Sequence, residues 1–413
     1  MKIIIAPDHF KESLSALAVA TQIEAGFREI YPDAEYIKMP MSDGGEGTVE
    51  AIVAATRGRI EAVRVSGPLG QPVAAFYGLT GDGKTAIIEM SAASGLTLLS
   101  LGERNPWYTT SYGTGELIRA ALDAGARNFI VGIGGSASND GGAGMIQALG
   151  GRFLDAQGHE LEPGGGALER LARIDIKNLD VRLRDCRIDV ACDVDNPLTG
   201  PAGASMMFGL QKGATPEMMI RLDNNLARYA EQVRVDLGIT VDGIPGAGAA
   251  GGMGAAFLGF LKARLRPGIE IVTEAVGLDR LIAEADLVVT GEGRIDGQTK
   301  HGKTPIGVAR LAKRYGKPVI GIAGCLTRDA NEVYSCGIDA VFSVLSAPCT
   351  VAEALSNAAE NTRKAARNVA AAIRLGEQLA AQIDSVAGVK AGGTLETHRG
   401  GLLNMTPMPI HPV

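Results

Sequence analysis

The strongest constraint on the fold is a strand–loop–helix pattern that opens the chain and returns near its end. Lys2–Ala6 is a short run rich in isoleucine, which predicts a buried strand. Ser15–Ile30 has the apolar spacing of a helix, and Glu35–Met41 predicts a second strand before a helix that reaches Thr56. Strands that alternate with helices form parallel, doubly wound sheets, so the opening of the chain predicts such a sheet.

The pattern changes near residue 60. Three short apolar runs between Glu61 and Met90, separated by glycine and proline turns, predict an antiparallel meander. The first pattern returns from Glu274, and Ala352–Leu375 predicts a long, alanine-rich helix. A second unit is therefore inserted into the first.

These patterns predict an α/β fold in three parts. A discontinuous Rossmann-like domain with a doubly wound parallel sheet takes residues 1–59 and 274–376, and a mixed α/β domain is inserted at residues 60–273. Residues 377–413 form a tail. Its end has no strand or helix periodicity, so we expect that end to be flexible or non-native.

Composition argues against several classes of partner. The net charge is -6 and no run rich in Lys or Arg stands out, which argues against nucleic acid. No apolar stretch reaches the roughly 18 residues of a membrane span. The five cysteines have no paired spacing, which predicts reduced thiols and a cytoplasmic protein. The sequence leaves open whether the chain forms a homodimer.

Polar residues gather where strands of the predicted sheet domain end. Ligands of open parallel sheets bind outside the carboxyl ends of the strands. Acidic and basic residues together at these ends are more than a plain turn requires, so we expect a ligand site there. Its candidate residues are Asp8, Lys11, Asp43, Glu292, Arg294 and Asp296.

Two predicted helix starts have features of anion sites. After the strand that ends at Ile133, consecutive glycines precede a helix, and such amides bind phosphate or carboxylate. The loop is not a Walker A motif, and a packing turn is the alternative. Lys303 begins another helix, where a cation opposes the dipole; a bound phosphate would explain it, and a solvated lysine is the alternative. The candidates are Gly134, Gly135, Ser136, Asp140 and Lys303.

Asp193 and Asp195 stand two residues apart just after a predicted strand. In an extended chain both carboxylates would point to one face and repel each other unless a cation or a proton relieves them. That arrangement fits a general base beside a magnesium ligand, with a solvated turn as the alternative. Lys212 follows in a glycine-containing loop that we expect to approach a ligand. Gly246–Gly254 is either another such loop or a seam of small residues between helices.

Several long motifs stand in a fixed order along the chain. They are APDHFKESLSA at Ala6–Ala16, SDGGEGT at Ser42–Thr48, IGGSASNDGG at Ile133–Gly142, ACDVDNPLTG at Ala191–Gly200, FGLQKGAT at Phe208–Thr215, GAAGGMG at Gly248–Gly254, PGIEIV at Pro267–Val272 and TGEGRIDGQT at Thr290–Thr299. From Met1 to about Gly376 the chain resembles the type I glycerate kinases of bacteria. The resemblance implies ATP and magnesium, D-glycerate as acceptor, 2-phosphoglycerate as product, and a Rossmann-like domain with an inserted α/β domain.

Two positions depart from the family pattern. The family usually has Ser where this chain has His9, and Pro where it has Leu210. A histidine in the first loop adds a hydrogen-bond donor and, near neutral pH, a positive charge beside the acceptor. We expect His9 to affect the affinity for the substrate or its identity, and Leu210 only to loosen its loop.

Phosphoryl transfer depends on positioning and charge stabilisation, which suggests a role for each charged loop. We expect Asp193 to accept the proton of the acceptor hydroxyl and Asp195 to bind magnesium. Lys11 and Arg294 would hold the glycerate carboxylate or the γ-phosphate. The further metal candidates are Glu292 and Asp296, and the further candidates for substrate or phosphate binding are Asp8, Asp43, Gly134–Ser136, Asp140, Lys212 and Lys303.

Other functions remain open at the level of sequence. The chain could be a kinase for another small hydroxy acid or one that forms 3-phosphoglycerate. A non-catalytic sensor of sugar acids would need to have lost charged loop residues, and these are present. A nicotinamide-dependent oxidoreductase would need a dinucleotide fingerprint with an acidic residue about 20 positions further on, which is missing.

Overall fold

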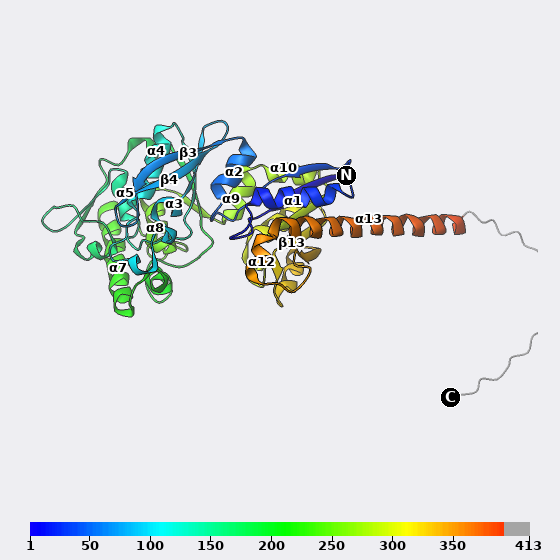
Figure 1. Cartoon of the computed structure of the whole chain (residues 1–413). Coiled ribbons are helices and arrows are strands. Elements are labelled where there is room, and N and C mark those ends of the chain that lie inside the picture. The colour runs from blue at the N-terminus through cyan, green and yellow to red at the C-terminus, as the bar shows by residue number, and fades with distance from the viewer. Residues whose placement is uncertain (392–413) are drawn as a thin grey trace, which may run out of the picture.

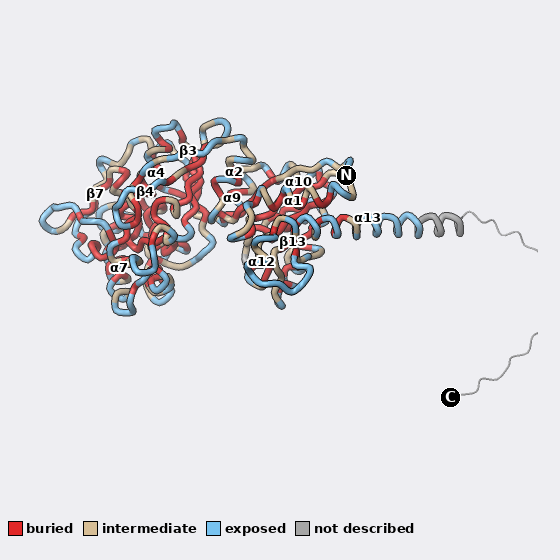
Figure 2. Tube along the Cα trace, in the orientation of Figure 1, coloured by how far each residue is buried: buried red, intermediate tan, exposed pale blue. Residues whose placement is uncertain are grey.

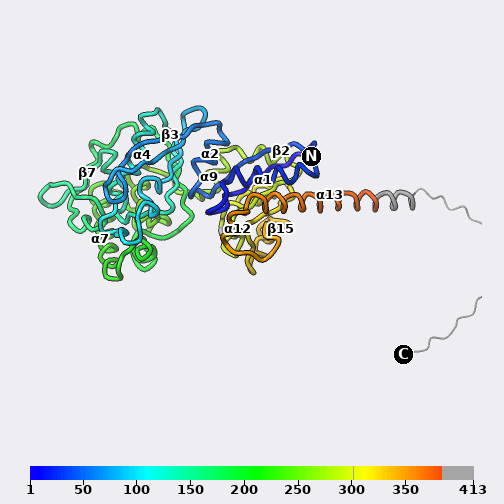
Figure 3. Tube along the Cα trace, viewed as in Figure 1, coloured from blue at the N-terminus to red at the C-terminus, as the bar shows by residue number. Residues whose placement is uncertain are grey.

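The computed structural model describes residues 1–391, so the end of the predicted tail, residues 392–413, lies outside the described residues. The chain forms two lobes, and the order of the chain passes from one to the other and back (Figures 1 and 3). The first lobe contains a five-stranded, all-parallel sheet in the order β15-β13-β11-β1-β2. Its strands are β1 (Lys2–Pro7), β2 (Glu35–Lys38), β11 (Leu287–Gly291), β13 (Val319–Ala323) and β15 (Ala340–Ser343).

Helices cover both faces of the first sheet. Ile3 and Ile5 of β1 pack against α1 (Ala16–Arg28) and α13 (Ala358–Ala391). Ile4 points to the opposite face. The helices of that opposite face are α9 (Gly268–Ala275), α10 (Leu278–Ala283) and α11 (Thr304–Arg314). A buried strand whose successive residues pack against helices on opposite faces of the sheet is typical of a doubly wound sheet.

The second lobe contains a six-stranded mixed sheet in the order β10-β9-β6-β5-β4-β3. The first two pairs along the chain, β3–β4 and β4–β5, are antiparallel, and the remaining pairs are parallel. The strands are β3 (Arg59–Ser66), β4 (Pro72–Leu79), β5 (Thr85–Glu89), β6 (Asn128–Gly132), β9 (Arg187–Ala191) and β10 (Arg264–Arg266). Its helices are α3 (Ser91–Ser94), α4 (Tyr112–Asp123), α5 (Ala143–Ala148), α6 (Ala204–Phe208), α7 (Pro216–Leu237) and α8 (Ala249–Leu261).

A shared layer of helices joins the two sheets. Ile87 and Ile130 of the second sheet belong to the same buried cluster as Ile4 of the first sheet. Between them lie α9 and α2 (Thr48–Thr56), and α2 packs on β3, β4 and β5. The predicted α/β class is therefore confirmed. The predicted division at residues 59/60 and 273/274 stays a prediction, because the apolar core is continuous across it.

Two predicted elements differ clearly in their bounds. The strand expected over Glu35–Met41 ends at Lys38, two residues before Pro40. The helix expected at Ala352–Leu375 is two helices, since α12 (Val351–Ser356) ends before Asn357 and α13 begins after it. The remaining short strands are β7 (Arg152–Leu154), β8 (Arg173–Asp175), β12 (Arg294–Ile295) and β14 (Cys325–Leu326).

The last helix, α13, leaves the body of the protein. Its first part packs on α1, and its second part extends beyond the lobe (Figures 1 and 2). Leu375, Leu379 and Ile383 are more than half exposed there. Among the helices of residues 1–391, none is both long enough and apolar enough to cross a membrane.

Glycines make the junction between the lobes. The loop after β2 rests on the carboxyl ends of β6 and β9, and Gly44 has φ +93° there. A Cβ on Gly44 would lie 2.3 Å from the Cβ of Ala191 and 3.1 Å from the Cα of Gly268. These contacts hold the loop against the second sheet, where it forms one wall of the cavity described below.

We expect Gly44→Ala to be markedly more destabilising than Gly47→Ala. Both positions have positive φ, but a Cβ on Gly47 (φ +87°) would meet nothing within 4 Å. The difference is therefore overpacking, which should lower the free energy of unfolding by about 1–3 kcal/mol beyond the control. Urea denaturation of the two variants measures it. Equal losses of stability in the two variants would mean that the loop and Ala191 move apart to accommodate the added Cβ at no energetic cost.

Candidate active site

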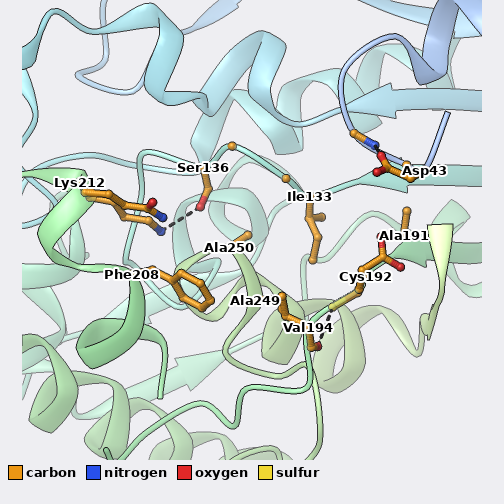
Figure 4. A pocket seen from close by; sticks show the side chains of 16 residues that line it. Asp43, Ile133, Ser136, Ala191, Cys192, Val194, Phe208, Lys212, Ala249 and Ala250 are labelled. Carbon is orange, nitrogen blue, oxygen red and sulfur yellow. Dashed lines mark hydrogen bonds between the residues drawn. The ribbon is translucent and has the colours of Figure 1, made fainter. Parts of the chain in front are cut away.

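A cavity of about 300 Å³ opens where the two lobes meet. Its walls come from the loop after β2, the ends of β6 and β9 with the loops that follow them, the segment Phe208–Lys212 and the start of α8 (Figure 4). Lys212 lies at one end of the cavity and Asp43 at the other (Figure 4). The lining residues are Asp43, Gly44, Gly45, Ile133, Gly134, Gly135, Ser136, Ala191, Cys192, Asp193, Val194, Phe208, Gln211, Lys212, Ala249 and Ala250.

One end of the cavity has the character of an anion site. Lys212 is only 2% exposed, and its Nζ donates to Ser136 Oγ at 2.9 Å and to the Ser138 carbonyl at 2.7 Å. Both acceptors are neutral, so burial lowers the pKa of the ammonium to about 7, although Asp140 opposes this shift. Gly134 and Gly135 are exposed beside it. A buried cation without an anionic partner favours a ligand that supplies one.

Asp140 does not line the cavity, but it holds the glycine loop at the Lys212 end in place. The carboxylate is 1% exposed and accepts from the amide and hydroxyl of Ser111, both at 2.8 Å. It also accepts from the amides of Gly142 and Gly144. Both oxygens are thus occupied by the protein, and the side chain holds the glycine loop in place.

The segment Gly246–Gly254 matches both alternatives predicted for it, a loop beside a ligand and a close-packed seam of small residues. Ala249 and Ala250 line the cavity, and Ala250 has the left-handed backbone with φ 53°. A Cβ on Gly251 would lie 2.1 Å from the Ser138 carbonyl oxygen. The segment is therefore both a cavity wall and a close-packing seam against the loop that holds Lys212.

The other end of the cavity is acidic. Asp193 Oδ1 accepts from the Gly268 amide at 3.1 Å. Although Asp193 has much exposed surface, the surrounding cleft raises its pKa to about 6, and the charge of Asp43 adds to this rise. Burial and the charge of Asp8 in turn raise the pKa of Asp43. The carboxylate of Asp43 is therefore repelled by Asp193 on one side and by Asp8 on the other, which favours a proton or a cation beside it.

A second and larger space lies on the other side of Asp193. This groove, of about 980 Å³, runs between α9 and α11. Cys192, Asp193 and Val194 line both spaces, whereas Asp195 lines only the groove. The two aspartates therefore share the groove but not the cavity.

The remaining predicted residues form a polar cluster on the first lobe. Asp8 Oδ1 contacts His9 Nδ1 at 2.7 Å, and Asp8 Oδ2 accepts from Thr304 Oγ1 at 2.5 Å. Glu292 accepts from Thr299 and from Lys303, and burial raises its pKa to about 7. Asp296 pairs with Arg294 at 3.0 Å and with Lys303 at 3.7 Å. Neither space is lined by the cluster residues Asp8, Glu292, Arg294, Asp296 and Lys303. The same holds for Lys11, which is exposed and whose side chain forms no hydrogen bond or ion pair within residues 1–391.

The contact between His9 and Asp8 should make the stability of the protein depend on pH. The hydrogen bond to Asp8 raises the pKa of His9, and the charges of Glu46 and Asp43 add to this. The pair therefore stabilises the fold fully below about pH 6.5, and this contribution is lost as the pH rises through the raised value. We expect the difference in Tm between wild type and His9→Ser to shrink from about pH 6 to about pH 9. A constant difference would contradict this, and the exposed His159→Ser is the control.

Sequence reasoning missed some lining residues. Phe208 and Gln211 line the cavity and belong to the FGLQKGAT motif, but their residue types alone do not predict a role there. Arg310 and Arg314, four residues apart on α11, line the groove. Such a pair on a helix is the usual pattern of a solvated face, so the sequence contained no signal for them.

Comparison with known proteins agrees with these features. The model of the Glycerate kinase family matches residues 3–374. A glycerate kinase of Bacillus subtilis (strain 168) is 59% identical, with 92% of this chain and 99% of the relative covered. A glycerate 2-kinase of Escherichia coli (strain K12) is also 59% identical, with 91% and 99% covered.

A similar fold is known from a crystal structure. A protein of Salmonella typhimurium LT2, provisionally assigned as glycerate kinase 2, has a TM-score of 0.85 and 63% identity. It covers 92% of this chain and 99% of its own. The motifs, the two-lobed α/β fold and these matches lead to one conclusion: the chain belongs to the Glycerate kinase family.

Proposed function

We propose that the protein is an ATP-dependent kinase that phosphorylates the C2 hydroxyl of D-glycerate. The hydroxyl oxygen forms a bond to the γ-phosphorus, the bond between that phosphorus and the β–γ bridging oxygen breaks, and ADP leaves. The product is 2-phospho-D-glycerate. The observation that carries the proposal is the cavity with an anion site at Lys212 and a carboxylate, Asp193, toward its other end.

The two ends of the cavity suit the two ends of glycerate. Lys212 and the amides of Gly134 and Gly135 would bind the carboxylate of the substrate. Asp193 would then take the proton that the hydroxyl loses as the new bond forms. Burial and the charge of Asp43 raise the pKa of Asp193 to about 6, which brings it close to the value that suits a general base near neutral pH.

Magnesium fits the residues on the groove side. No group of three or more His, Cys, Asp or Glu within the described residues is arranged to hold a metal ion. Mg²⁺ is usually bound by one or two carboxylates together with substrate phosphates, so a full protein cage is not required. Asp195, which lines the groove, would hold it, and Glu292, which lies on the first lobe and lines neither space, is the second candidate. When bound, the ion neutralises charge on the transferred phosphate.

Asp296 fits magnesium less well. Its carboxylate accepts from the amides of Gln298 and Thr299 and pairs with Arg294 and Lys303. We therefore assign Asp296 to positioning Arg294 and Lys303, the two cations with which it pairs. All five cysteines are free, which supports the cytoplasmic location proposed from the sequence.

The test is a coupled assay of ADP release with ATP, Mg²⁺ and D-glycerate, followed by ³¹P NMR of the product. Turnover to 2-phosphoglycerate is the expected result. Formation of 3-phosphoglycerate would overturn the regiochemistry, and turnover only with another hydroxy acid would overturn the substrate. Binding of D-glycerate without any ADP release would favour a sensor.

A further inference from the structure

We infer that the two spaces beside Asp193 divide the substrates: the groove between α9 and α11 binds the nucleotide, and the smaller cavity binds the acceptor. This inference rests on the proposed function. The spaces measure about 980 Å³ and about 300 Å³. ATP is several times larger than glycerate, so only the groove has room for both base and triphosphate. The segment Cys192–Val194 lines both spaces, which places Asp193 where the substrates would meet.

The groove has free positive charge on one wall. Arg310 and Arg314 lie one turn apart on α11, and neither forms a hydrogen bond or ion pair among residues 1–391. The other cations of the groove already have partners, since Arg266 pairs with Glu274 at 2.8 Å and Lys300 pairs with Glu332 at 2.5 Å. Guanidinium groups bind phosphate oxygens in a bidentate manner, so the two arginines suit a polyphosphate.

The groove has free negative charge at its junction with the cavity. Asp195 is exposed and makes no hydrogen bond or ion pair within the described part of the chain. A phosphate alone would satisfy the arginines and be repelled by this carboxylate. A magnesium nucleoside triphosphate satisfies both, because it combines anionic oxygens with a divalent cation.

The groove also has an apolar part for the base. Pro245, Leu265 and Ile269 line it, and Ile269 is only 4% exposed. Planar heterocycles are commonly held by such apolar surface with a few polar groups at the edge. The cavity, in contrast, has the anion site at Lys212 and little further length, which fits a small hydroxy acid.

The first experiment measures binding of the non-hydrolysable ATP analogue AMP-PNP with Mg²⁺ by isothermal titration calorimetry. The double variant Arg310→Ala/Arg314→Ala should raise the Kd at least ~10-fold, as expected for losing charge-assisted hydrogen bonds. The KM for glycerate should stay within about twofold. The control is Arg184→Ala, because Arg184 is exposed, unpaired among the described residues and outside both spaces. Unchanged AMP-PNP binding with a raised KM for glycerate would overturn the assignment.

A second experiment uses the unaltered protein. Photolabelling with 8-azido-ATP, followed by peptide mapping, should mark residues 264–274 or 300–314 of the groove. Label confined to Phe208–Lys212 or to Ala249 and Ala250 would place the nucleotide in the cavity and overturn the inference. Nucleotide binding that depends on the arginines, in a protein that does not phosphorylate glycerate, would refute the proposed function and leave the nucleotide site standing.

Discussion

Replacing Lys212 with methionine is expected to lower kcat/KM for glycerate at least ~100-fold while leaving the fold at least as stable as before. The activity falls because the variant loses the positive charge at the anion end of the cavity. Stability is kept because a buried ammonium with only neutral acceptors costs desolvation that its two hydrogen bonds do not offset. Steady-state kinetics and urea denaturation of the same preparations measure the two effects.

The pH dependence of stability provides a check on the same residue. The pKa of Lys212 is about 7 in the folded protein and 10.5 for an unperturbed lysine. Between these values the unfolded chain binds more protons, so the stability of the wild type rises with pH across this window. The advantage of the methionine variant should be greatest below about pH 7 and fade toward about pH 10.5. Near-normal activity would remove Lys212 from the site, and the exposed Lys84→Met is the control for loss of a lysine.

The second large effect is expected for Asp193→Asn, which should lower kcat at least ~100-fold. The amide has nearly the same shape and can still accept from the Gly268 amide, but it cannot take the proton of the hydroxyl. Substrate binding should change little, so KM for glycerate should stay within a fewfold range. A loss of less than about tenfold would remove Asp193 from the role of general base.

Asp195→Asn is the matched control in the same loop. It lines the groove but not the cavity, so its loss should raise the Mg²⁺ concentration needed for half-maximal rate. Excess Mg²⁺ should therefore restore the rate of Asp195→Asn and leave Asp193→Asn impaired. Rescue of both variants would mean that both carboxylates serve the metal and that the base lies elsewhere.

Much of the fold follows from local pattern. The strand predicted at Lys2–Ala6 is β1, which ends one residue later at Pro7, and the helix predicted at Ser15–Ile30 is α1, with Ser15 as its N-cap. The break at Asn357 is not predicted because the Ser356-Asn357 pair stands within an alanine-rich run with helical spacing on both sides. The capping box of Thr350 and Glu353 fixes the start of α12. The direction of α13 after the break follows from its packing on α1, which is a contact between distant parts of the chain.

The loops that form the site could be predicted from the sequence. How their residues divide between the cavity and the groove could not. Residue type and strand ends identified Asp43, Gly134 and Asp193, which line one cavity. The burial of Lys212 could not be predicted, because lysine in a glycine loop is usually solvated. Equally, nothing in the sequence indicates that Asp195 lines a different space from Lys212, since that depends on how one lobe sits against the other.

The pairing of β1 with β11 has a consequence for synthesis on the ribosome. Ile3 pairs with Leu287, so β1 cannot pair with β11 until the ribosome has added a further 284 residues. At typical elongation rates this takes roughly 15–60 s. All strands of the second sheet lie within Arg59–Arg266, so that lobe can complete itself in the meantime. The lobe that begins the chain is therefore the last to be finished, and its first two strands emerge with an apolar edge that a chaperone or a neighbouring nascent chain can bind.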